Sequence, residues 1–149
     1  MTMPEKSQFC TFYLDQLLFG AELQGVQEVI RCPEMTRIPK APEIFRGLIN
    51  LRGQIVTAID LRRRLELKPM AEDATPMNVV VRCQDGTVSL LVDSIGDVVE
   101  VDQDSFEKPP ENLSKAMRAL IAGVHKLPNR LLHVLELEKL VQITELPQD

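Results

Sequence analysis

Residues 47–65, GLINLRGQIVTAIDLRRRL, give the first indication of the fold. An apolar run leads to Arg52-Gly53, and a second apolar run follows. Two such runs separated by a short segment that contains glycine are typical of a β-hairpin. Asp60 precedes LRRRL, where an aspartate can cap a short helix. The segment therefore predicts a strand, a tight turn, a second strand and a short helix.

The same pattern recurs 76 residues later in the chain. Residues 47–65 align without a gap with 123–141, GVHKLPNRLLHVLELEKLV, so that a glycine, an acidic residue and a helix start fall in phase. A weaker match with a shift of 69 places VQEV (26–29) over IGDV (95–98). These matches indicate an internal duplication, with two similar β units that each end in a short helix.

The rest of the chain also reads as short strands. A turn at Asp15-Gln16 separates two of them, and a polar, proline-bearing segment at 68–77 resembles a linker. Residues 103–118 read as a polar loop that becomes helical after Ser114. Short strands with turns every eight to twelve residues favour a small barrel, because closure removes exposed sheet edges. We therefore predict an all-β fold with two five-stranded barrel subdomains and a groove between them.

Composition and charge exclude several classes of protein. Of 149 residues 44% are hydrophobic, enough for a core, and the net charge of −5 argues against a nucleic-acid partner. With one Tyr, five Phe and no Trp, the chain also lacks the aromatic platform of a ligand-stacking barrel. Three separate cysteines predict neither a disulfide framework nor a zinc site. We expect a reduced, cytoplasmic protein.

No catalytic or cofactor motif is present in the sequence. His125 and His133 are the only histidines, and we interpret them as hydrogen-bonded or solvent-facing side chains rather than metal ligands. Glycine-rich phosphate loops and nucleophile elbows are absent, so we expect no enzyme and no cofactor. Arg62–Arg64 could bind phosphate, but we interpret them as the solvated face of a helix that buries Leu61 and Leu65.

Residues 26–65 resemble the CheW family, the adaptors of bacterial chemosensory arrays. VQEV, TRIP, GLINLRG and an ID-L pair follow one another in the order and spacing of that family, and the resemblance covers residues 9–142. It implies two SH3-like five-stranded barrels and a non-enzymatic role that couples chemoreceptor tips to the histidine kinase CheA. The approximate subdomain ranges are 9–67 and 78–142, whose boundaries the chain ends can cross, with flexible tails at 1–8 and 143–149.

The resemblance also implies site residues. Val26, Glu28 and Arg52 match motif positions that lie at the receptor-binding surface of the family. An arginine fork suits a carboxylate, so we expect Arg52 to pair with Glu28. Val26 could line a receptor groove or belong to the core. For the kinase regulatory domain we select Ile38 and Pro39 in the proline-rich loop.

Two other functions remain open at this point. The first is a CheW-like adaptor of a chemosensory pathway that does not control flagella, and the second is a small-ligand-binding β-barrel. In the leading hypothesis the protein reaches the inner face of the membrane only through receptor arrays, without inserting into the membrane.

Overall fold

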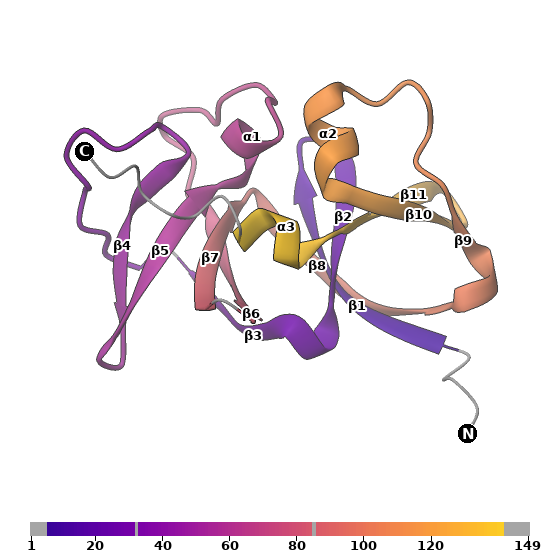
Figure 1. The fold of residues 1–149 in the computed structure, drawn as a ribbon, viewed down its shortest axis with the longest axis horizontal. Helices are drawn as coiled ribbons and strands as arrows, with labels where there is room; N and C mark the ends of the chain where they lie inside the picture. The colour runs from indigo at the N-terminus through magenta and orange to yellow at the C-terminus, as the bar shows by residue number, and fades with distance from the viewer. Residues whose placement is uncertain (1–5, 32, 85, 142–149) are drawn as a thin grey trace.

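The computed structural model describes residues 6–31, 33–84 and 86–141 (Figure 1). Strand β1 begins at Lys6, so residues 6–8 belong to a strand and not to the predicted tail. Residues 1–5 and the predicted tail 143–149 lie outside the described residues. The strands are β1 (Lys6–Leu14), β2 (Leu17–Glu22), β3 (Val26–Arg31), β4 (Phe45–Leu51), β5 (Gln54–Asp60), β6 (Met77–Cys83), β7 (Gly86–Val92), β8 (Ser94–Asp102), β9 (Phe106–Glu107), β10 (Ile121–Leu127) and β11 (Arg130–Leu135).

The helical elements are short. They are α1 (Leu61–Arg64), α2 (Lys115–Leu120) and α3 (Leu137–Val141), with the 3-10 turns η1 (Leu23–Gly25) and η2 (Gln103–Ser105). The predicted cap is present, because the Asp60 side chain accepts a hydrogen bond from the Arg63 N–H. Ser114 also caps its helix by accepting a hydrogen bond from the Met117 N–H. Such bonds satisfy amides at a helix start that have no partner within the helix. None of the described helices is long and apolar enough to cross a membrane.

The described residues form two sheets, as predicted for an all-β protein with two subdomains. One has five strands in the order β3-β6-β7-β5-β4, and the other has six in the order β8-β1-β2-β11-β10-β9. The hairpin β1–β2 therefore lies in the same sheet as β8–β11, and the hairpin β6–β7 lies with β3–β5. Each of the ranges 9–67 and 78–142 thus contributes a hairpin to the sheet of the other.

Strand pairing confirms the internal duplication. Phe45 pairs with Ile59 in hairpin β4–β5, and Ile121 pairs with Leu135 in hairpin β10–β11, so that both partners are displaced by 76. Both hairpins have a register shift directly after this pair. Equal registers at equal spacing mean that the repeated sequence pattern specifies the same local structure twice.

The shift of 69 relates the remaining strands. Phe12 pairs with Phe19 between β1 and β2, and Val81 pairs with Val88 between β6 and β7. Strand β3 likewise corresponds to β8. When each strand is replaced by its counterpart, the order β3-β6-β7-β5-β4 becomes β8-β1-β2-β11-β10, which is the order of the other sheet. The two sheets are therefore repeats that exchange one hairpin.

The largest apolar core lies between the two sheets. Phe12 and Phe19 from the six-stranded sheet belong to the same buried cluster as Ile59 and Leu90 from the five-stranded sheet. Helix α3 follows β11 but packs against β6 and β7 of the other sheet, and its Leu140 is fully buried (Figure 1). Since apolar burial is the main favourable term in folding, this shared core joins the subdomains.

Candidate functional site

The tip of hairpin β4–β5 is a two-residue turn. Leu51 pairs with Gln54, which leaves Arg52 and Gly53 as the loop, with φ of 51° and 90°. Two successive positive φ angles are the mark of the type I′ turn, whose twist matches that of the flanking strands. The side chain of Asn50 accepts a hydrogen bond from the Gly53 N–H at 2.9 Å and supports the turn.

Arg52 is an unfavourable choice for this backbone. A left-handed conformation costs a residue with a side chain about 1–2 kcal/mol, and type I′ turns favour Asn, Asp or Gly for this reason. Gly53 carries no such penalty at its own positive φ. Backbone strain of this kind is frequent at functional sites, and Arg52 shares its positive φ with Asp15, Lys40 and Glu66.

The predicted ion pair between Arg52 and Glu28 is present. The Nη2 group of Arg52 donates to Oε2 of Glu28 in strand β3. The Arg52 side chain is 69% exposed and that of Glu28 is 27% exposed. Strands β3 and β4 are the two outer strands of the five-stranded sheet. The pair therefore connects the β4–β5 tip to the opposite edge of the sheet, at one end of the barrel.

The ion pair stabilises the charged form of both partners. The hydrogen bond from Arg52, followed by one from the Gln27 side chain at 3.3 Å, lowers the pKa of Glu28. The bond to Glu28 raises the pKa of the Arg52 guanidinium in turn. Both groups are therefore ionised at neutral pH, so a positive and a negative charge lie side by side at the tip.

A β-bulge in β3 separates Val26, the third predicted receptor residue, from Glu28. Val26 pairs with Val81 and Glu28 with Val80, so that Gln27 has no partner of its own across the ladder. A bulge of this kind redirects side chains on an edge strand. Val26 is partly buried and packs against the main core, whereas Val29 is 39% exposed. Val29 therefore exposes an apolar side chain on β3, whereas Val26 belongs with the core.

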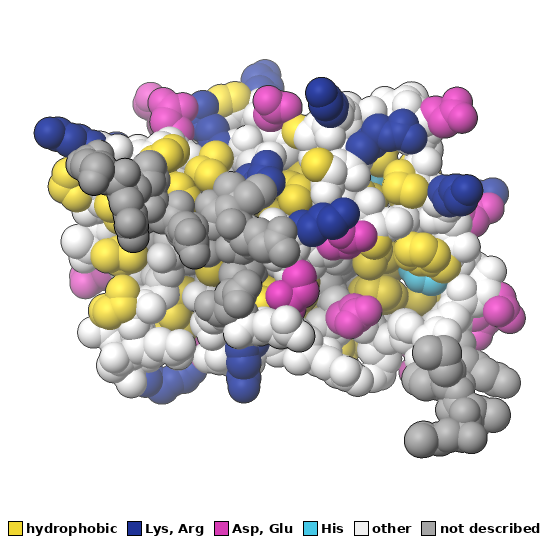
Figure 2. Space-filling view, in the orientation of Figure 1, with side chains coloured by type: hydrophobic (Ala, Val, Ile, Leu, Met, Phe, Trp, Pro, Cys, Tyr) yellow, Lys and Arg dark blue, Asp and Glu magenta, His cyan; other side chains and the backbone are white. Residues whose placement is uncertain are grey.

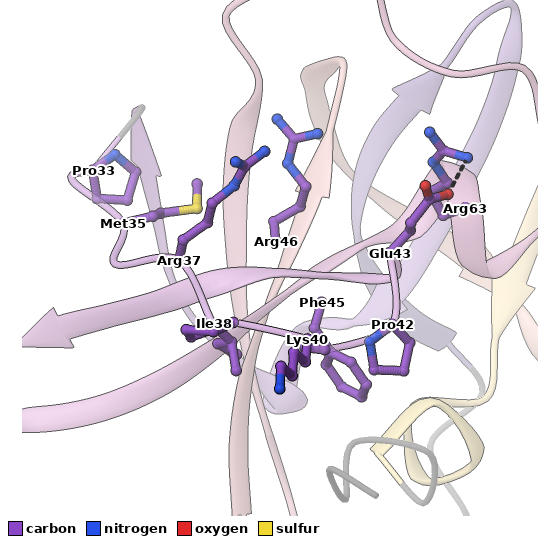
Figure 3. A pocket seen from close by; sticks show the side chains of 12 residues that line it. Pro33, Met35, Arg37, Ile38, Lys40, Pro42, Glu43, Phe45, Arg46 and Arg63 are labelled. Carbon is purple, nitrogen blue, oxygen red and sulfur yellow. Dashed lines mark ion pairs between the residues drawn. The ribbon is translucent and has the colours of Figure 1, made fainter.

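Ile38 and Pro39 lie at a different place. They line a pocket of about 660 Å³ between the loop 33–44 and strand β4 (Figure 3). Its lining residues are Pro33, Met35, Arg37, Ile38, Pro39, Lys40, Ala41, Pro42, Glu43, Phe45, Arg46 and Arg63. Val26, Glu28 and Arg52 are not among them. The structure thus brings Arg52 together with Glu28 and keeps Ile38 and Pro39 apart from that pair.

The pocket has a basic rim that sequence reasoning missed. Arg37 extends from the loop and Arg46 from β4 in the same direction (Figure 3). Arg63 forms an ion pair with Glu43 at 2.8 Å, and Arg46 lies 3.9 Å from Asp60. The lining contains three arginines and one lysine but only one carboxylate, that of Glu43. The pocket therefore has local positive charge, although the protein as a whole is acidic.

The histidines are structural side chains. The Nδ1 atom of His125 lies 2.7 Å from the Ser105 hydroxyl, and that of His133 lies 2.9 Å from the Leu18 carbonyl oxygen. Burial lowers the pKa of His125. Within the part of the chain that the structure describes, no group of three or more His, Cys, Asp or Glu side chains could hold a metal ion.

The solvated-face interpretation of the arginine triplet was wrong for Arg62. Its side chain is only 8% exposed, because its guanidinium lies between the carboxylates of Asp15 and Asp93. Arg63 is exposed, as expected. On the face of the molecule in Figure 2, described acidic and basic side chains are interspersed.

Comparison with known proteins assigns the fold and the sequence to one family. The family model described as CheW-like domain matches residues 8–145. The chain is 29% identical to the chemotaxis protein CheW of Treponema pallidum (strain Nichols), with 95% of this chain and 86% of that protein covered. It is 31% identical to the chemotaxis protein CheW of Bacillus subtilis (strain 168), with coverages of 79% and 76%.

A solved structure agrees with the sequence matches. The scaffolding protein TtCheW from Thermoanaerobacter tengcongensis superposes with a TM-score of 0.79 at 28% identity, and 90% of each chain is covered. The match includes both sheets, which agrees with the two SH3-like subdomains predicted from the sequence. The matching proteins are named as chemotaxis and scaffolding proteins. Together these findings indicate a chemotaxis scaffold protein, and the chain belongs to the CheW-like domain family.

Proposed function

We propose that the protein is a non-enzymatic adaptor that couples the cytoplasmic tips of chemoreceptors to a CheA-type histidine kinase. The observation that carries the proposal is the Arg52–Glu28 pair, held by a strained turn at the end of the five-stranded barrel. An exposed ion pair contributes little to folding, about 0–1 kcal/mol, and the turn would be more stable with another residue. A partner is therefore the better explanation for this arginine.

The chemistry of the pair suits a helical receptor tip. A guanidinium has five N–H donors, and the Arg52 side chain is largely exposed, so donors beyond the one used by Glu28 can reach a carboxylate or carbonyl of the partner. Val29 provides exposed apolar surface on the same strand as Glu28. An amphipathic helix docks through apolar anchors flanked by polar contacts. We propose Val26, Glu28 and Arg52 as receptor-binding residues.

The kinase regulatory domain would bind elsewhere. We propose the pocket beneath Ile38 and Pro39, because its lining combines apolar side chains with the arginines of its rim. Its lining residues are distinct from the receptor set, so both partners could bind one molecule at the same time. Simultaneous binding is what a coupling role requires. The protein would act in the cytoplasm and reach the membrane through the receptors.

The direct test uses purified protein immobilised on a resin. A CheA-type kinase and a receptor cytoplasmic fragment are applied separately and then together. The proposal expects each to be retained alone, and both to be retained together without competition. A matched resin carrying the Arg52→Ala variant should lose most receptor and keep the kinase. Retention of neither partner would contradict the adaptor role, and competition between them would contradict separate surfaces.

A further inference from the structure

Arg62 forms the most extensive buried ionic contacts that the described residues show. Its Nε atom donates to Oδ1 of Asp93 at 2.8 Å, and its Nη2 group donates to Oδ2 of Asp93 at 2.5 Å. The same Nη2 group donates to Oδ1 of Asp15 at 2.6 Å, and Nη1 donates to the Lys68 carbonyl oxygen at 2.7 Å. We call Arg62, Asp15 and Asp93 the Arg62 cluster.

The members of the Arg62 cluster come from different sheets. Arg62 belongs to α1, which continues β5 of the five-stranded sheet. Asp15 lies in the β1–β2 turn of the six-stranded sheet. Asp93 lies between β7 and β8, where the chain passes from one sheet to the other, and its carboxylate also accepts the Asp15 N–H at 2.7 Å. One guanidinium therefore binds both sheets and the connection between them.

The internal repeat does not require this arginine. The position 76 residues after Arg62 is Glu138, which is exposed. Leu61 of α1 and Leu65 directly after it are already fully buried. A buried charge is costly unless it is well paired, and the planar guanidinium fork binds two carboxylates in a fixed geometry that a lysine ammonium does not impose. The Arg62 cluster is thus a feature of the first repeat unit that the second unit, with Glu138 at the same position, does not share.

The cluster is not needed merely to hold the sheets in contact. The apolar core between them contains residues of both sheets and three helices. Apolar packing is non-directional, whereas four hydrogen bonds from one rigid guanidinium fix distances and angles. Buried polar groups can select one arrangement among several that apolar packing allows.

We propose that Arg62 is a positioning residue that fixes the orientation of the two sheets relative to each other. The inference goes beyond the adaptor role and would hold if that role were wrong, because it concerns only the geometry between the sheets. The sheets are joined by the core in any case, and Arg62 selects the angle at which they meet.

Residual dipolar couplings measured on the full chain test the proposal. In the unmodified protein, the amides of the five-stranded and six-stranded sheets should fit one alignment tensor. In Arg62→Met they should require two tensors of different magnitude or orientation. Arg62→Lys, which keeps the charge but lacks the planar fork, should restore the single tensor only in part. Arg63→Met is the matched control, because Arg63 pairs with Glu43 beside the same sheet, and it should leave one tensor.

A second variant keeps the test decisive if Arg62→Met fails to fold. Asp15→Asn removes the negative charge that Arg62 binds in the β1–β2 turn but keeps the Asp15 N–H bond to Asp93, and the Asp15 side chain is half exposed, so the fold should survive. The proposal expects its two sheets to depart from a single tensor, by less than in Arg62→Met. A single tensor in a folded Arg62→Met, or in Asp15→Asn when the methionine variant does not fold, would overturn the proposal.

Discussion

The hairpins β4–β5 and β10–β11 have the same register but different tips. Their paired residues match at a constant spacing of 76, including the register shift near the first pair. At the first tip Arg52 and Gly53 both have positive φ. At the second tip Pro128 and Asn129 occupy these positions, and neither has a positive φ. The backbone pairing is therefore conserved within the repeat up to the residues that form the turn.

The contacts of the tips differ as well. Arg52 crosses to the edge strand β3 and pairs with Glu28. The second tip has an arginine at its end, Arg130, which donates to the Tyr13 hydroxyl and lies 5.6 Å from the centroid of that ring. Arg130 thus contacts its own sheet through an aromatic side chain. The comparison shows that the repeat determines the strand pairing of both hairpins. The candidate site lies where the first hairpin departs from the repeat, at Arg52.

Truncation of equivalent core residues should destabilise the fold equally in both repeat units. Ile59 and Leu135 are equivalent in the repeat and 2–3% exposed. Ile59→Ala and Leu135→Ala should each lower the free energy of unfolding by about 2–5 kcal/mol, because each leaves a cavity in the shared core. Urea titration followed by circular dichroism measures both. A loss below about 1 kcal/mol in only one of them would show that the two units are not equivalent.

The carboxylate of Asp93, which Arg62 binds, should make the stability of the fold sensitive to acid. Burial disfavours the charged form of Asp93, but hydrogen bonds from Arg62 and the Asp15 N–H outweigh it and lower the pKa of Asp93. The ordinary value is about 3.9. A lowered pKa in the folded state contributes stability above that value, and the contribution is lost as the pH falls through the folded pKa.

We therefore expect the wild-type protein to lose stability steeply from about pH 5 downward. Asp93→Asn should be less stable at pH 7 but have a shallower decline, since its amide does not titrate. Urea titrations at a series of pH values measure both slopes. Parallel slopes for the two proteins would contradict the stabilisation of the Asp93 carboxylate by Arg62.

The first tip should tolerate replacement of its arginine without loss of the fold. Asparagine adopts the left-handed conformation more readily, which offsets the loss of an exposed ion pair. Arg52→Asn should leave the free energy of unfolding within about 1 kcal/mol of the wild-type value. Thermal unfolding monitored by calorimetry measures this change. A fall of more than about 2 kcal/mol would assign Arg52 to the fold and remove the main argument for a partner.

Local patterns explain why much of the fold could be predicted. The glycine, the acidic residue and the helix start recur at the same positions in both units. Each of them determines the backbone conformation only within a few residues of itself. The capping by Asp60 and the turn at Arg52-Gly53 follow from that proximity. The pairing of Arg52 with Glu28 needed the further inference that β3 lies near the turn, and the structure places the two side chains together. The receptor role came only from the family resemblance.

What could not be predicted depends on contacts between distant residues. Arg62 lies 47 residues from Asp15 and 31 from Asp93, and no local spacing relates them. Its burial follows from the exchange of hairpins between the sheets, which the repeat allows but does not specify. The basic rim of the pocket has the same origin, because Arg37 and Arg46 come from a loop and a strand that meet only in the folded chain.

The central claim is that Arg52 serves a partner rather than the fold, and isothermal titration calorimetry of Arg52→Ala tests it most directly. A receptor tip fragment and a kinase regulatory domain are titrated separately, with Arg130→Ala from the second tip as the matched control. Arg52→Ala should weaken receptor binding by roughly 1.5–3 kcal/mol, the range for a charged hydrogen bond, and change kinase binding much less. Arg52→Lys should recover part of the loss, and Arg130→Ala should bind the receptor as the wild type does. Unchanged receptor affinity in Arg52→Ala, or an equal loss in Arg130→Ala, would contradict the claim.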